Sequence, residues 1–190
     1  TFALPGGRTS SLAQAELKTF IFDRLKVMLR DAGKRFDVID AVLPLEDLAS
    51  QDDLVLVARK LDALEAFLKT KDGADLAAAF KRGANILKAE EKKGALPGAT
   101  VDAAALALAE EKALHAALAA AETKAEAAIK VEDFTAAMAA LSSLRAPLDA
   151  FFEKVTVNAD DPKLRANRLA LLMRLRAATA GVADLSKLEG

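Results

Sequence analysis

Two clusters of basic and amide side chains have residue types that could bind nucleic acid. The first is Lys81, Arg82 and Asn85, and the second is Arg165, Asn167 and Arg168. A guanidinium group can donate two parallel hydrogen bonds to a phosphate or stack on an unpaired base, and an amide can bond to a base edge. We treat both clusters as candidate RNA contacts. Arg145, just before Pro147, is a further candidate.

The second cluster belongs to a segment that predicts a helix from Pro162 to about Thr179, capped by Asp161. This helix has five basic residues and no acidic one. Helical spacing places three arginines on nearly one face, apart from a seam of leucines. We expect the leucines to pack inward and the arginines to point outward. The alternative is an ordinary solvated face, or arginines that pair with Glu153, Asp160 or Asp161. The residues concerned are Arg165, Arg168 and Arg176, with Leu164, Leu171 and Leu175.

The first cluster lies in a predicted helix that runs from about Asp75 to Lys92. Gly83 falls in the middle of it, where a glycine costs about 1 kcal/mol relative to alanine. This suggests the close approach of another backbone, although a tolerated imperfection is the alternative. Gly73 is expected to end the preceding helix.

Residues that could perform catalysis or bind a metal are scarce in this chain. There is no cysteine, and His115 is the only histidine, without a second ligand at metal-binding spacing. The acidic pairs at 52–53 and 160–161 are typical of helix starts. We therefore expect no catalytic residue, no metal site and no cofactor site here.

No apolar run is long enough to span a bilayer, and the first residues lack a signal-peptide core. These features favour a cytoplasmic protein without a membrane partner. The chain has no initiator methionine, and we interpret it as a piece of a longer protein.

The net charge of −1 conceals a segregated distribution. Residues 69–93 carry 7 basic and 4 acidic side chains, and residues 162–190 carry 6 and 2. Between them, residues 94–161 carry 5 basic and 11 acidic side chains. A fold that brought the two basic segments together would create a positive face on a nearly neutral protein. Ordinary fluctuation of surface charge is the alternative.

The spacing of apolar residues predicts an all-α fold, a helical bundle. The first helix is expected to start at Ser10 or Ser11 and run to about Ala32, with one buried face. The next spans 36–43, and another opens at Ser50 or Gln51. Asp102 is expected to cap a long Ala-rich helix. The buried face of the first helix would comprise Leu17, Phe20, Ile21, Leu25, Met28 and Leu29.

Three blocks in this order carry a family resemblance: residues 22–43, residues 80–87 and residues 151–172 with 182–188 behind them. The set resembles the carboxyl-terminal part of the β subunit of bacterial glycyl-tRNA synthetase, the heterotetrameric type. Gly83 departs from the family pattern, which more often has a residue such as alanine there. The blocks span nearly the whole chain.

The resemblance implies that residues 73–190 form a helical anticodon-binding domain related to that of arginyl-tRNA synthetase. Residues 1–72 would form a helical linking region. The parent enzyme, an aminoacyl-tRNA synthetase, joins glycine to its tRNA with ATP and magnesium. Its catalytic site would lie mainly in the α subunit. The implied partners are glycine tRNA and that α subunit, and not DNA.

Two functions from different classes remain open at this point. In the first, the seven candidate residues bind the anticodon arm, and Arg165→Ala with Arg168→Ala weakens tRNA binding without unfolding the domain. In the second, the chain is a helical scaffold that docks a partner subunit and never contacts RNA. The scaffold gains support if the two basic segments lie on opposite sides of the fold.

Overall fold

A computed structural model describes residues 8–43 and 53–189, and within these ranges every regular element is a helix. This confirms the all-α prediction. The α-helices are α1 Arg8–Asp31, α2 Phe36–Val42, α3 Leu54–Leu68, α4 Lys71–Glu91, α5 Ala109–Lys130, α6 Phe134–Ser142, α7 Arg145–Lys154 and α8 Pro162–Thr179. Two short 3₁₀ turns, η2 Ala103–Ala105 and η3 Leu185–Lys187, complete the set.

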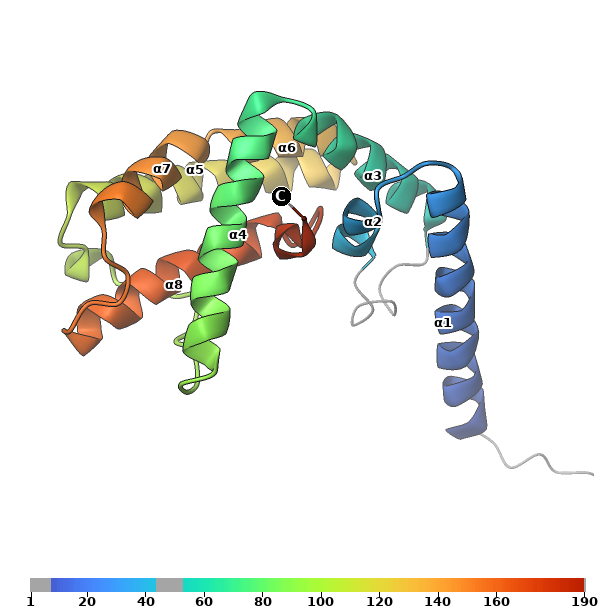
Figure 1. The fold of residues 1–190 in the computed structure, drawn as a ribbon, viewed down its shortest axis with the longest axis horizontal. Coiled ribbons are helices and arrows are strands. Elements are labelled where there is room, and N and C mark those ends of the chain that lie inside the picture. Colours follow the sequence, from blue (N-terminus) through green and yellow to red (C-terminus); the bar gives the residue numbers. More distant parts are fainter. Residues whose placement is uncertain (1–7, 44–52, 190) are drawn as a thin grey trace, which may run out of the picture.

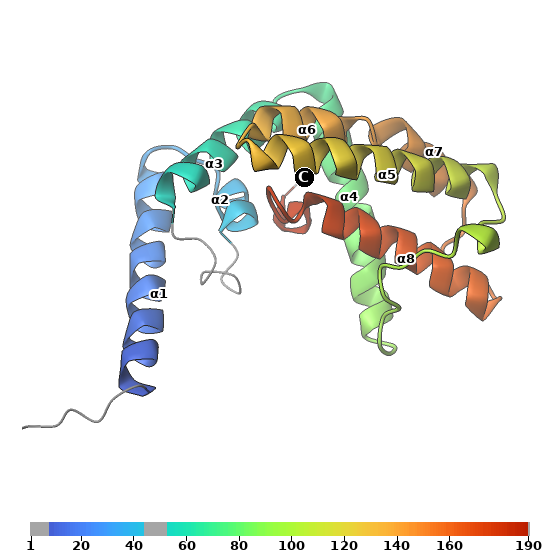
Figure 2. The same cartoon turned by 180° about the vertical axis from the view of Figure 1, so that it is seen from behind.

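Helices α5, α6 and α7 form one layer, and α8 lies beside α5 (Figures 1 and 2). Helix α4 crosses α8 and also packs against α3 and α7 (Figure 1). The interior between them is apolar, with Leu118, Phe151 and Leu171 fully buried. The two basic segments are therefore neighbours, because α4 carries one and α8 carries the other.

Side-chain caps explain where several helices begin. The Asp161 carboxylate accepts hydrogen bonds from the backbone N–H groups of Lys163 and Leu164, and Pro162 occupies the first turn of α8. This start agrees with the sequence prediction. Asp53 caps α3 in the same way. The predicted opening at Ser50 or Gln51 lies outside the described residues.

Three predicted helix boundaries were wrong. Ser10 and Ser11 lie inside α1, which begins at Arg8. Gly73 does not end a helix, because Thr70 caps α4 and accepts from the Gly73 N–H, at 3.0 Å. Asp102 caps the short turn η2 instead of the Ala-rich helix, which begins at Ala109.

Gly83 lies where α4 crosses α8 and α7. A Cβ built there would meet side-chain carbons of Leu172, Phe152 and Leu175 at 3.6–3.8 Å, which is ordinary van der Waals contact. Another backbone does not approach closely, so the first explanation of this glycine was wrong and the tolerated imperfection fits. α4 could accept an alanine at this crossing.

The first helix does not have the single buried face that its sequence predicts. Phe22 is buried, and Leu25 and Leu29 pack against the core. Leu17, Phe20, Ile21 and Met28 are instead exposed, by 43–67%. Figure 1 shows why: α1 extends away from the other helices. The division of the chain at residues 72 and 73 stays a prediction.

Candidate nucleic-acid interface

One face of α4 presents a row of polar side chains that includes part of the first predicted cluster. Lys81, Asn85, Lys88 and Lys92 recur at intervals of four, three and four residues, so they follow one side of the helix. Eleven residues of helix place them along about 16 Å. Asn85, Lys88 and Lys92 are exposed, and Lys81 is half-buried. We call these four residues the α4 row.

The lysines of the α4 row form no ion pair with the described part of the chain. In the described ranges, no carboxylate lies within ion-pair distance of Lys81, Lys88 or Lys92. Most of the basic side chains around them are paired, as Lys93 is to Glu90 at 2.8 Å. Unpaired ammonium groups lose no internal partner when a phosphate binds, so this face is electrostatically ready for an anion.

A shallow hollow of about 640 Å³ lies along the α4 row. Its lining includes the apolar side chains of Ile86 and Ala89, and Asn158 from the loop before α8. The lining also includes Lys81, Arg82, Asn85 and Lys93. A hollow that combines apolar, amide and cationic side chains suits an unstacked base joined to a phosphate.

Arg82 is held against the neighbouring helix. Its guanidinium lies 4.6 Å from the centre of the Phe152 ring and donates a 3.3 Å hydrogen bond to the Phe152 carbonyl oxygen. The side chain is nevertheless exposed. Phe152 itself is buried, and its ring meets that of Phe151 edge-on. The stack therefore fixes Arg82 at the border of the hollow with donors still available.

The arginines of α8 do not form the outward face that their spacing predicts. Arg165 pairs with Glu90 at the end of α4, and Arg176 lies 3.8 Å from Glu91. These two bonds tie α8 to α4 beside the hollow. Arg165 is partly exposed, at 37% of its side chain, so it borders the candidate surface without being free.

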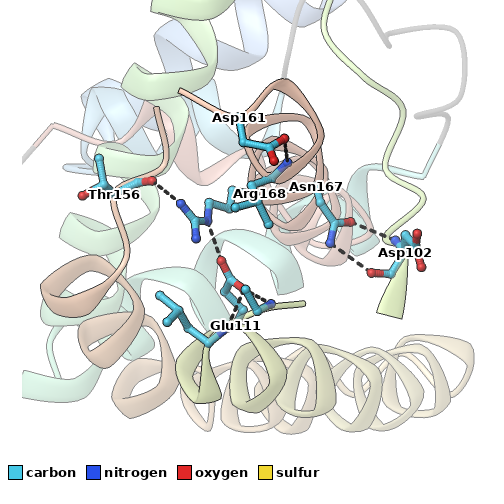
Figure 3. Close-up of polar contacts among 9 residues, drawn as sticks. Asp102, Glu111, Thr156, Asp161, Asn167 and Arg168 are labelled. Carbon is cyan, nitrogen blue, oxygen red and sulfur yellow. Dashed lines mark hydrogen bonds and ion pairs between the residues drawn. The ribbon is translucent and has the colours of Figure 1, made fainter. Parts of the chain in front are cut away.

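Arg168 is the clearest correction to the expected outward direction, because its side chain is only 9% exposed. It donates to the buried carboxylate of Glu111 and to the Thr156 carbonyl oxygen at 2.8 Å (Figure 3). The other Glu111 oxygen accepts from the backbone N–H groups of Ala107 and Leu108. This pair connects α8, the first turn of α5 and the loop after α7.

Asn167 is also turned inward. Its side-chain oxygen accepts from the Asp102 N–H at 2.8 Å, and its amide nitrogen donates to the Asp102 carbonyl oxygen at 3.0 Å (Figure 3). Both bonds are to the backbone, so Asn167 fixes the loop between α4 and α5. Asn167 and Arg168 are thus bonded inside the fold, and their predicted RNA contacts stay untested.

The two carboxylates that pair with Arg165 and Arg168 have lowered pKa values. Burial raises the pKa of Glu111, but the Leu108 N–H, Arg168 and the Ala107 N–H together outweigh it and lower the pKa below its usual value. Hydrogen bonds from Lys93 and Arg165 lower the pKa of Glu90. Both groups therefore act as fixed anions: Glu111 neutralises Arg168 inside the fold, and Glu90 neutralises Lys93 and Arg165 nearer the surface.

Arg145 lies apart from the other candidates. It forms ion pairs with Asp72 at 2.5 Å and with Asp75 at 2.6 Å, both at the start of α4. These bonds join the start of α7 to the opposite end of α4 from Lys92. We assign Arg145 to this joint between helices, and its predicted RNA contact stays untested.

His115 accompanies an internal ion pair. Arg174 binds Glu122 through two nitrogens, at 2.7 and 2.5 Å, and lies 2.9 Å from His115 Nδ1. This is a packing role of the expected kind. Among residues 8–43 and 53–189 no group of three or more His, Cys, Asp or Glu side chains could hold a metal ion.

The structure brings Lys81, Arg82 and Asn85 together on one surface with Arg165 at its edge. It places Arg145, Asn167 and Arg168 elsewhere. Sequence reasoning missed Lys88, Lys92 and Asn158. The four-three-four spacing of the α4 row could have revealed the two lysines, whereas Asn158 reaches the hollow through the fold of a loop and leaves no pattern.

The fold and the site together define a class of protein. It is an all-α domain in which one helix presents cationic side chains beside a shallow hollow. A family model for the DALR anticodon binding domain matches residues 76–183. The chain belongs to this family. No helix in the described part of the chain has the length and apolar character needed to cross a membrane.

Two curated relatives are longer proteins. The chain is 52% identical over 177 residues to the glycine–tRNA ligase β subunit of Rhodospirillum centenum, covering 92% of the chain and 24% of the relative. It is 50% identical over 175 residues to the glycine–tRNA ligase β subunit of Phenylobacterium zucineum, covering 92% of the chain and 26% of the relative. The chain thus spans about a quarter of the length of the curated relatives it matches.

Proposed function

We propose that this chain is the tRNA-binding part of a glycine–tRNA ligase β subunit and that it binds the anticodon arm of glycine tRNA through the face of α4. The observation that carries this proposal is the row of unpaired lysines beside the hollow. The family and the relatives support the choice of ligand.

In the proposed complex, the lysines of the α4 row neutralise successive phosphates. Binding of this kind releases counterions and makes affinity depend on salt. Arg82 and Asn85 then contact a base that has left the stack, because stacking and edge hydrogen bonds are how single-stranded loops are recognised. Glu90 reduces the positive charge at the rim of the hollow, because its carboxylate forms ion pairs with Arg165 and Lys93.

The chemistry of aminoacylation belongs, in this proposal, to other parts of the ligase. ATP and magnesium would bind at the catalytic site, mainly in the α subunit of a heterotetramer, and the enzyme would work in the cytoplasm. This chain would position the tRNA and supply no catalytic group.

The test is a salt titration of glycine tRNA binding to the chain and to a variant with Lys81→Gln, Lys88→Gln and Lys92→Gln. Each phosphate contact contributes about 0.7 to 0.9 to the slope of log K against log salt. We expect the variant to bind more weakly at low salt and to lose about two units of slope.

The matched control carries the same change of charge on α5: Lys112→Gln, Lys124→Gln and Lys130→Gln. All three control lysines are exposed on the acidic helix. Equal losses in both variants would show a general charge effect and would refute the α4 surface. Retained binding and slope in the α4 variant would do the same.

The scaffold alternative loses the support that it required. The two basic segments pack against each other instead of lying on opposite sides. No observation at the α4 face favours a protein ligand over RNA.

A further inference from the structure

Helix α1 has two apolar faces, and the described part of the chain covers one of them. Phe22, Leu25 and Leu29 face α2 and the core. The second face lies about a quarter to a third of a turn away and holds Leu17, Ile21 and Met28, spaced at four and seven residues, with Phe20 beside them. Their exposed fractions are 58%, 43%, 67% and 57%. We call these four residues the outer α1 face.

The position of α1 is fixed, so this exposure does not come from a detached helix. Phe22 is 3% exposed, and Lys26 forms a 2.7 Å ion pair with Asp40 of α2. The Arg24 guanidinium lies 5.2 Å from the centre of the Phe20 ring. The inner face therefore holds α1 in place while the outer face stays exposed. The helix itself extends away from the bundle (Figure 1).

Exposed apolar side chains concentrate outside the segment that matches the anticodon-binding family. Within the described residues, eight of the ten large apolar side chains that are exposed fall between Leu17 and Val55. The other two, Leu108 and Val131, lie within the matched segment 76–183. The matched domain has thus covered its apolar surface, and the region before it has not.

We propose that the outer α1 face packs against the rest of the same β-subunit polypeptide, outside these 190 residues. The matched relatives are about four times as long as the part that this chain covers, which leaves ample protein to cover the face. A covalent tether holds that partner at high effective concentration.

The size of the face favours a tethered partner over a separate one. Four half-exposed apolar side chains present on the order of 400 Å². A stable interface between separate molecules needs about 800 Å² on each side. A second copy of the chain would find too little surface here, whereas an intramolecular contact needs less.

The experiment places the photo-crosslinking residue p-benzoylphenylalanine at Phe20 in the complete β subunit, assembled with its α subunit. After irradiation, mass spectrometry identifies the linked peptide. We expect a peptide of the same polypeptide from outside this chain. A mixture of isotopically light and heavy β subunits separates links within one chain from links between copies.

The control places the same residue at Val131, which is 75% exposed on the matched domain. A link from Phe20 to the α subunit or to a second β copy would overturn the proposal. A yield no higher than that from Val131 would also overturn it. If the Phe20 variant fails to accumulate, Met28, which is 67% exposed on the same face, replaces it with the same expected outcomes.

Discussion

Arg168 and Glu111 form a buried ion pair that joins the second turn of α8 to the first turn of α5. Their side chains are 9% and 2% exposed. The pair is surrounded by three further bonds, from the Ala107 and Leu108 N–H groups and to the Thr156 carbonyl oxygen. A residue that the sequence suggests for RNA binding is therefore part of the internal framework.

Replacing Arg168 with methionine is expected to destabilise the fold. The change keeps the apolar length of the side chain and leaves the Glu111 carboxylate buried without its cation, which costs about 3–5 kcal/mol. Urea unfolding measures the loss. Lys163→Met, an exposed position on the same helix, should change the free energy of unfolding by less than about 0.5 kcal/mol. Similar effects of the two substitutions would contradict the assigned role.

The lowered pKa of Glu111 predicts how the free energy of unfolding depends on pH. The pKa of Glu111 is lower in the folded chain than in the unfolded one, where it is about 4.3. Its contribution is therefore complete above pH 4.3 and is lost as pH falls through the folded pKa. Urea unfolding between pH 3 and 7 should show a shallower acid loss in Glu111→Gln than in the parent chain. Glu126→Gln, an exposed change on α5, should keep the parental slope.

Two glycines of α4 should respond oppositely to alanine. Gly83→Ala fills ordinary contact space and removes a flexible residue from mid-helix, so we expect a gain of about 0.5–1 kcal/mol. At Gly73 a Cβ would lie 1.9 Å from the Phe67 carbonyl oxygen, and the backbone must shift, at a cost of about 1–3 kcal/mol. Thermal unfolding measures the Tm of each variant relative to the parent chain. A Tm of Gly83→Ala below that of the parent chain would contradict this prediction.

Asn85 and Lys88 should affect tRNA binding in different ways. Asn85→Ala removes an amide that could reach a base edge, so we expect about tenfold weaker binding of glycine tRNA and a smaller loss for an anticodon-swapped tRNA. Lys88→Gln removes a phosphate contact and should weaken both tRNAs equally. Equilibrium binding at one fixed salt concentration decides this. Equal losses for both tRNAs with Asn85→Ala would argue against base recognition there.

The sequence predicted helix boundaries well where neighbouring residues alone determine them. Asp161 followed by Pro162 marks the start of α8 because capping uses only neighbouring residues. Gly73 misled because glycine signals a helix end by statistics. Here the side chain of Thr70, three residues earlier, provides a stronger helix start.

The direction of the α8 arginines could not be obtained from helical spacing. Residues 167–172 are all buried, so α8 is surrounded on most sides and an arginine within it must find a carboxylate. The excess of acidic residues in 94–161 supplies Glu111 and Glu122 for Arg168 and Arg174. The α8 arginines are thus paired with carboxylates, whereas the lysines of the α4 row have no ion-pair partner among the described residues.

The outer α1 face shows a second limit of periodicity. Spacing identifies apolar side chains that need cover, but it does not identify what covers them. Leu17 and Leu25 both belong to the face that spacing predicted to be buried, yet Leu17 is exposed and Leu25 packs against the core.

The bonds made by Arg165, Asn167 and Arg168 also constrain the order of events during synthesis. They join residues 75, 65 and 57 positions apart, so each closes a long loop. A ribosome releases α4 and the start of α5 well before α8. During that interval Glu90, the Asp102 backbone and Glu111 lack their α8 partners, which are Arg165, Asn167 and Arg168, and α4 is not yet held against α8. The proposed RNA-binding face of α4 therefore acquires its final shape only after α8 has been translated.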